Sequence, residues 1–144
     1  METRAGAVLA GAVFVYAGIL KASDPLQFAN DLSNYRILPW SLGVRLAFYL
    51  PWLEIVAGLA LIFHRIFAGA LVITGTLMFA FIGALIWTKM LGINVACGCF
   101  GAASSNLTFT WHLVLNGSIL GLLIFLWVTR ERVNFVAPVE DFPA

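Results

Sequence analysis

The residues best suited to chemistry are the two cysteines of the chain, Cys97 and Cys99, which are separated only by Gly98. A disulfide between them would close a ring of about 11 atoms, and a strained disulfide is easily reduced and acts as an oxidant. Gly98 supplies the backbone freedom that such a closure requires. The attacking species is a thiolate, which a nearby cation such as Lys89 or His112 would favour. The pattern indicates a dithiol/disulfide pair that exchanges electrons with a partner's thiols, a static disulfide that fixes a turn, or two free thiols.

Metal and nucleic acid are disfavoured as ligands. Cys97, Cys99 and His112 supply three metal ligands, whereas a structural zinc ion takes four, and the cysteine spacing matches no four-ligand zinc pattern. The formal net charge of +1 gives no basic surface for nucleic acid. We therefore predict neither a metal ion nor nucleic acid as a partner of this chain.

Glu54 is the third candidate, because it lies near the middle of the apolar run 42–63. A carboxylate that faces lipid is costly, so Glu54 must face other helices, be protonated, or pair with a cation such as Lys21, Arg36 or Arg45. Its functional interpretation is a proton acceptor or part of a quinone pocket, and its structural interpretation is a tie between two helices. Lys21 is either the partner of Glu54 or a side chain that extends to the membrane surface.

These side chains must be held by a membrane domain. Hydrophobic residues make up 62% of the chain and charged residues only 10%, against roughly 25% charged in soluble domains. We predict one all-α domain over residues 1–144, an integral membrane bundle of four transmembrane helices with an interfacial amphipathic helix. The predicted segments are spans at 5–21, 42–63, 66–88 and 111–129, the interfacial helix at 24–38, and a cysteine loop at 89–110.

The interfacial helix is predicted from its first residues and its spacing. Asp24 and Pro25 form a typical helix start, a capping residue followed by a first-turn proline. Apolar residues then recur at helical intervals until Pro39. The alternative is an irregular polar loop. In the next span, Pro51 removes a backbone hydrogen bond and predicts a kink.

The orientation follows from the cysteines and not from the charges. Four spans put both termini on one side of the membrane, and the Lys and Arg residues near the span ends divide four against four. Disulfides persist outside the cytoplasm. We therefore predict cytoplasmic termini and an extracytoplasmic cysteine loop.

Several motifs occur in the order found in a known family. They are Lys21-Ala22-Ser23-Asp24-Pro25, Tyr35 with Leu38-Pro39, Leu50-Pro51-Trp52-Leu53-Glu54, and Cys97-Gly98-Cys99-Phe100-Gly101. With these motifs the chain resembles, from about residue 5 to residue 129, the MauE branch of the DoxX-like membrane proteins. The cysteine motif and the Pro-x-x-Glu of the second span are its most specific parts.

The resemblance implies a four-helix protein of the bacterial inner membrane with a redox-associated role. MauE belongs to the machinery that matures methylamine dehydrogenase, whose small subunit is rich in disulfides, and it acts alongside a thioredoxin-like partner. By resemblance, this chain would work with a similar extracytoplasmic partner or an immature substrate.

Three functions are then compared. The first is a thiol–disulfide oxidoreductase component in which Cys97 and Cys99 alternate between disulfide and dithiol, with Glu54 and Lys21 shaping a polar cavity for a quinone head-group. The second is a non-catalytic subunit of a larger membrane complex, motivated by the small size of the chain and a GxxxG pair in the last span. The third is a small-solute carrier coupled through Glu54, which no internal inverted repeat supports.

Overall fold

The computed structural model describes residues 2–93 and 109–136, and these residues form five α-helices and no strand. The predicted cysteine pair lies outside the described residues. The helices are α1 (Glu2–Ser23), α2 (Pro25–Asn34), α3 (Trp40–Ile62), α4 (Phe67–Met90) and α5 (Phe109–Val136). All except α2 are long and apolar enough to cross a membrane. The predicted all-α, four-span architecture is confirmed.

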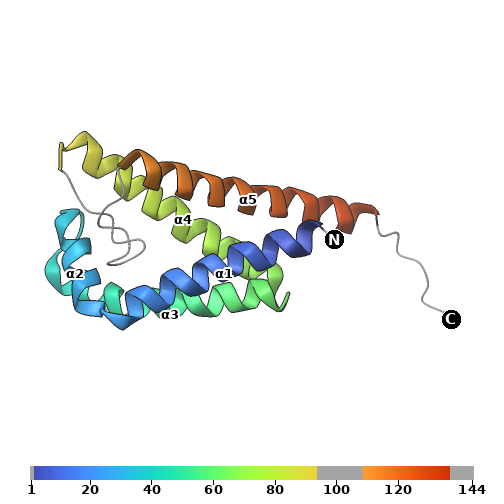
Figure 1. Ribbon diagram of the computed structural model, residues 1–144, viewed down its shortest axis with the longest axis horizontal. Helices are drawn as coiled ribbons and strands as arrows, with labels where there is room; N and C mark the ends of the chain where they lie inside the picture. Colours follow the sequence, from blue (N-terminus) through green and yellow to red (C-terminus); the bar gives the residue numbers. More distant parts are fainter. Residues whose placement is uncertain (1, 94–108, 137–144) are drawn as a thin grey trace.

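The four long helices pack side by side, each against two neighbours (Figure 1). Helix α1 packs against α3 and α5, and α4 packs against the same two helices from the other side. The start of α1 and the end of α5 lie at one end of the bundle, and α2 lies at the opposite end, where α4 ends and α5 begins. We call this opposite end the α2 end. The α1–α3 pair and the α4–α5 pair diverge toward the α2 end, and side chains of all four helices meet in the core nearer the start of α1.

The tightest helix pair is α1 with α3, and glycine makes it possible. A Cβ built on Gly11 would lie 2.5 Å from the carbonyl oxygen of Gly58, and one built on Gly58 would lie 2.7 Å from the carbonyl oxygen of Gly11. About two helical turns further along α1, a Cβ built on Gly18 would lie 2.8 Å from the carbonyl oxygen of Pro51. Backbones that approach this closely leave no room for side chains between them. The close contact brings the C-terminal half of α1 against the middle of α3.

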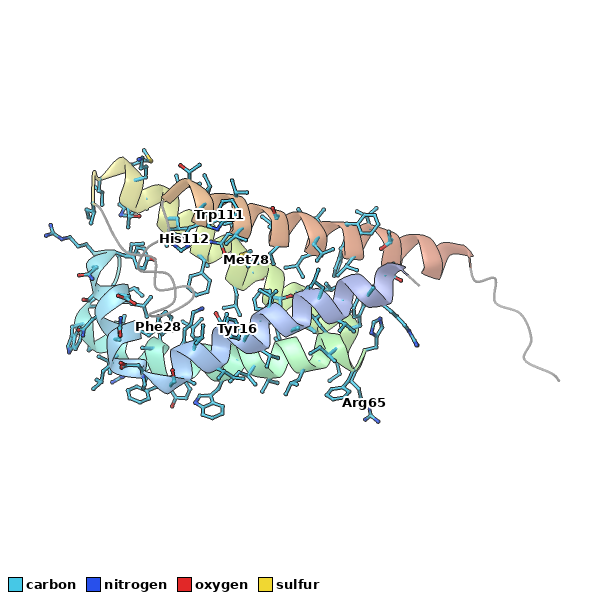
Figure 2. All side chains as sticks on the ribbon, viewed as in Figure 1. Tyr16, Phe28, Arg65, Met78, Trp111 and His112 are labelled. Atoms are coloured by element: carbon cyan, nitrogen blue, oxygen red, sulfur yellow. The ribbon has the colours of Figure 1, made fainter. Side chains whose placement is uncertain are left out.

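The core of the bundle is apolar over the half nearer the chain ends. Phe14 of α1, Leu61 of α3, Leu71 and Met78 of α4, and Leu126 of α5 belong to one buried cluster. Away from this core the helices carry exposed aromatic and aliphatic side chains on their outer faces, as expected of helices whose solvent is lipid. Figure 2 shows Met78 inside the bundle and Arg65 at the end opposite α2.

Helix α2 begins as predicted and ends earlier. The side chain of Asp24 accepts a hydrogen bond of 3.0 Å from the backbone N–H of Gln27, and Pro25 occupies the first helical turn. The helix stops at Asn34 instead of continuing to residue 38, because Arg36 adopts a positive φ of 52° that no right-handed helix can contain. Phe28 and Ala29 anchor α2 to the bundle by packing on α3.

The predicted spans match the long helices, with shifts of a few residues at their ends. Helix α3 runs without interruption through Pro51, whose side chain is buried. Helix α5 continues to Val136, beyond the predicted limit at residue 129. Its apolar stretch does end at Arg130, but Arg and Glu are good helix formers, so the backbone hydrogen bonding continues into the polar region.

Candidate functional site

A buried ion pair lies inside the bundle. The ammonium nitrogen of Lys21 donates a hydrogen bond of 2.6 Å to Oε1 of Glu54, and both side chains are only about 2% exposed. Lys21 lies in the last turn of α1 and Glu54 lies in the middle of α3. The other cations considered as partners, Arg36 and Arg45, are exposed. Lys21 therefore turns into the bundle instead of extending to the membrane surface.

The pair depends on the glycine contact described above. Lys21 and Glu54 are 33 residues apart in the chain, and each follows a position where α1 and α3 touch: Lys21 comes after Gly18, and Glu54 after Pro51. Removing one partner of a buried pair typically costs about 3–5 kcal/mol, because the other charge is left without compensation. The local sequence thus supplies the two charges, and the helix contact brings them into hydrogen-bonding distance.

Two aromatic rings enclose the Lys21 ammonium. Its nitrogen lies 4.3 Å from the ring centroid of Phe81 on α4 and 5.3 Å from that of Phe28 on α2. A cation above an aromatic face is attracted to it, by roughly 2 kcal/mol or more where water is excluded. The rings therefore stabilise the charge without adding polar atoms. They also connect the pair to α2 and α4.

Asn116 of α5 is the polar residue that the sequence interpretation did not place in the site. With Lys21, Glu54, Phe81 and Met78 it lines a cavity of about 20 Å³ at the centre of the bundle, which we call the polar cavity. Asn116 is 2% exposed, and its Nδ2 has no hydrogen-bond partner among the described residues. The signal that could have identified it is its type and position: an amide within the apolar span of α5, at the helical interval of four from His112.

Several atoms around this site lack partners within the described part of the chain. They are Oε2 of Glu54, Nδ2 of Asn116, and both ring nitrogens of His112, which is 2% exposed and lies at the start of α5 (Figure 2). A buried polar atom left unpaired costs about 1–3 kcal/mol. His112 is one helical turn from Asn116 on the same face of α5 and does not line the polar cavity. Along α5, Asn116 therefore lies beside the ion pair and His112 lies one turn nearer the α2 end.

A second, larger space lies on the other side of Phe81. It is an apolar groove of about 230 Å³ between α2, α3 and α4, lined among others by Tyr35, Leu50 and Phe81. We call it the apolar groove. Phe81 is a lining residue of both the polar cavity and the apolar groove. The groove has room for an aromatic ring, since a cavity of roughly 150 Å³ is enough to bind benzene.

The structure thus brings together part of the predicted site. Lys21 and Glu54 are in contact, and His112 lies nearer the α2 end. Cys97, Gly98 and Cys99 lie outside the described residues, so their relation to the pair stays a prediction. No group of three or more His, Cys, Asp or Glu side chains able to hold a metal ion occurs in residues 2–93 and 109–136.

Comparison with known proteins gives one match. The model of the family described as "Methylamine utilisation protein MauE" matches residues 3–129, which include all four long apolar segments. Neither the curated proteins nor the solved structures contain a significant match to this chain.

Proposed function

This chain belongs to the MauE family of membrane proteins, which implies a membrane role in methylamine utilisation, and from that premise we propose that it is a thiol–disulfide component of the bacterial inner membrane. The observation that carries the proposal is the Lys21–Glu54 pair, buried inside a multi-pass bundle. Ionisable groups at such depth are expensive and are usually kept for function. Lys21 lies in the last turn of α1, next to the end of the bundle where α4 ends and α5 begins.

The proposed reaction moves two electrons and two protons. A dithiol on an extracytoplasmic thioredoxin-like partner, or on an immature substrate, is oxidised to a disulfide while the Cys97–Cys99 disulfide is reduced to a dithiol. Reoxidation of Cys97 and Cys99 then passes two electrons and two protons to a quinone, which becomes a quinol. Glu54 has the role of proton acceptor and donor in this second step, and Lys21 holds it in place. His112 has the role of favouring the attacking thiolate.

The volumes of the two cavities favour one of them as the place for a quinone ring. The polar cavity, at about 20 Å³, is too small for a six-membered ring. The apolar groove of about 230 Å³ is large enough, and Phe81, whose ring centroid lies 4.3 Å from the Lys21 ammonium, is one of its lining residues. We therefore propose the apolar groove as the quinone site, in place of a head-group between Lys21 and Glu54.

Thiol titration tests the redox role. The membrane-embedded protein is equilibrated with thiol buffers of increasing potential, and alkylation that changes the mass counts the free thiols. We expect a reversible two-thiol transition, and loss of partner disulfide formation in Cys97→Ser and in Cys99→Ser. Ser118→Ala, on the exposed face of α5, is the control and should keep full activity. A pair that stays in one state at every potential, or activity that survives both cysteine substitutions, would rule out thiol exchange.

A specific observation supports a second candidate, a non-catalytic subunit of a larger complex. Gly117 and Gly121 of α5 are exposed, and a Cβ on either would meet nothing within 4 Å. The GxxxG pair is therefore not used within the described bundle, although such pairs commonly mediate contacts between membrane helices. In this case Gly117→Ile with Gly121→Ile would abolish copurification of other subunits, and Cys97→Ser with Cys99→Ser would not. Gly83→Ile, at an exposed glycine of α4, is the control.

A further inference from the structure

We propose that the apolar groove holds one acyl chain of an anionic phospholipid from the membrane leaflet at the α2 end, and that Arg36 binds the phosphate of this lipid. The proposal goes beyond the redox role and does not depend on it. If a quinone also uses the groove, the lipid and the quinone exclude each other there. The inference rests on the shape of the groove, the surface onto which it opens and the unpaired charge of Arg36.

The groove has the shape of a hydrocarbon chain. Its wall on α4 is formed at successive helical turns by Leu77, Phe81 and Ala84, so it follows the helix axis for about 10 Å. Membrane-spanning helices are tilted by only about 20° from the bilayer normal, along which lipid tails also extend. Of the residues that line the groove, only Tyr35 has a polar atom in its side chain. The groove therefore matches a lipid tail in direction and in polarity.

The groove opens sideways onto the lipid-facing surface. Among its lining residues Tyr35 is buried, whereas Ile37 and Leu46 are 48% and 37% exposed. A tail can therefore enter from the bilayer without leaving an apolar environment. Trp87 lies one helical turn beyond Ala84 toward the α2 end and is about half exposed, and tryptophan is enriched at the depth of the lipid headgroups. This end of the groove thus lies where a phosphate would be.

Arg36 supplies a cation at this end. It lies between two lining residues, Tyr35 and Ile37, and its exposed guanidinium forms no ion pair or hydrogen bond with the described residues. Its φ of 52° is a conformation in which glycine is less costly than a residue with a Cβ. Residues kept in such a conformation are concentrated at ligand sites. A guanidinium binds a phosphate group through two parallel hydrogen bonds.

The headgroup must decide which lipid binds. A tail is surrounded by apolar groups both in the bilayer and in the groove, so its burial gives no preference between lipids with identical tails. One arginine near an anionic membrane surface strengthens binding about fivefold. We therefore expect Arg36 to favour phosphatidylglycerol about fivefold over phosphatidylcholine, in which the choline cation offsets the phosphate charge.

Native mass spectrometry of the full-length protein tests the headgroup contact. The protein is equilibrated with equal amounts of dioleoyl phosphatidylglycerol and dioleoyl phosphatidylcholine, and the bound lipid is identified by mass. The wild type should prefer phosphatidylglycerol about fivefold, and Arg36→Gln should bind both lipids equally. Arg65→Gln, at an exposed arginine of the opposite end, is the matched control and should keep the preference. No preference in the wild type, or equal loss in both variants, would overturn the proposal.

A glycine substitution separates binding from folding. In Arg36→Gly the lipid preference should be lost, while the melting temperature in phosphatidylcholine should not fall, because glycine adopts the positive φ without strain. A preference that persists in Arg36→Gly would show that the guanidinium does not bind the phosphate.

Filling the groove tests the place of the tail. Ala84→Phe puts a ring into the groove and should abolish binding of phosphatidylglycerol, and the smaller Ala80→Leu should weaken it. Ile86→Phe is the matched control, because Ile86 is exposed on α4 and does not line the groove. Binding that survives both filling substitutions would place the lipid elsewhere and overturn the proposal.

Two competitors test the identity of the ligand. Glycerol phosphate, which has the anion but no tail, should not displace phosphatidylglycerol, and displacement at equal concentration would reveal a simple anion site. A copurified quinone found in the groove in place of phospholipid, lost in Ala84→Phe and unaffected by Arg36→Gln, would also overturn the proposal. None of the lipid measurements involves a thiol, so failure of the redox proposal and failure of this one are distinguishable.

Discussion

At the scale of single residues, the site is a charge pair whose surroundings are almost free of polar atoms. The ammonium of Lys21 donates a hydrogen bond to Glu54 and lies against the rings of Phe28 and Phe81. Such a pair is stable only while both members are present, because each charge compensates the other in a region without water to solvate it. The two residues therefore act as a unit, and their substitutions should not be additive.

A double-mutant cycle tests this coupling. Glu54→Gln leaves the Lys21 ammonium buried without a carboxylate, and we expect a loss of stability of about 3–5 kcal/mol. Lys21→Met with Glu54→Gln removes the charge as well and should recover most of that loss. The measurement is thermal unfolding in a mild detergent or bilayer mimic. Losses that simply add in the double variant would mean that the two side chains do not interact.

Asp31 of α2 gives a pH dependence outside the membrane spans. Partial burial, and secondly the nearby charge of Asp24, raise the pKa of the Asp31 carboxyl above its ordinary value of 3.8. The folded chain therefore binds more protons than the unfolded chain between 3.8 and the raised pKa, so the Asp31 contribution favours folding at low pH and is lost as the pH rises. Asp31→Asn should weaken this pH dependence of the melting temperature in acid. An identical pH profile in the variant would contradict the assignment.

At the scale of helices, the position of Glu54 is set by the contact between α1 and α3. The Gly11–Gly58 crossing and the approach of Gly18 to Pro51 fix how far the two helices slide and rotate against each other. A shift of one residue along either helix would rotate Lys21 or Glu54 by about 100° and separate the pair. Helix α2 carries Phe28, one of the two rings that lie against the Lys21 ammonium. The capped start of α2 at Asp24 therefore helps to hold this ring beside the ion pair.

Substitution of one glycine tests the role of this contact. Gly11→Ala places a methyl group 2.5 Å from the Gly58 carbonyl oxygen, so the helices must separate. We expect a loss of stability of about 1–3 kcal/mol, as for other overpacked cores. Gly117→Ala, where the new methyl meets nothing within 4 Å, is the matched control and should cause no loss. Equal unfolding temperatures for the two variants would show that the close contact is unimportant.

At the scale of the whole molecule, the bundle has two different ends. The start of α1 and the end of α5 lie at one, and α2, the end of α4 and the start of α5 lie at the other. The polar groups follow the same division, since Lys21, Asn116 and His112 lie toward the α2 end while the apolar core lies toward the chain ends. A reaction at the α2 end would therefore have buried polar groups beneath it.

Labelling from one side of the membrane tests the proposed orientation. A membrane-impermeant maleimide, added to intact spheroplasts after mild reduction, should label Cys97 and Cys99. Arg65→Cys in a Cys97→Ser/Cys99→Ser background is the matched control, because Arg65 is exposed at the opposite end and should react only after lysis. The reverse pattern of labelling would place the chain ends outside the cytoplasm.

The sequence alone determined the class of protein, the four spans and the capped start of α2, and it singled out Lys21 and Glu54, which the structure brings into contact. Each of these depends on local properties: hydropathy over about 20 residues defines a span, and Asp24-Pro25 defines a helix start without reference to the rest of the chain. It did not predict the end of α2, because the sequence carries no glycine there to signal the positive φ that Arg36 adopts. Tertiary structure decided which cation Glu54 meets, that Asn116 lines the same cavity, and that this cavity is too small for a six-membered ring. These outcomes depend on how closely α1 and α3 approach and how the other helices close around them, which involves residues far apart in the chain.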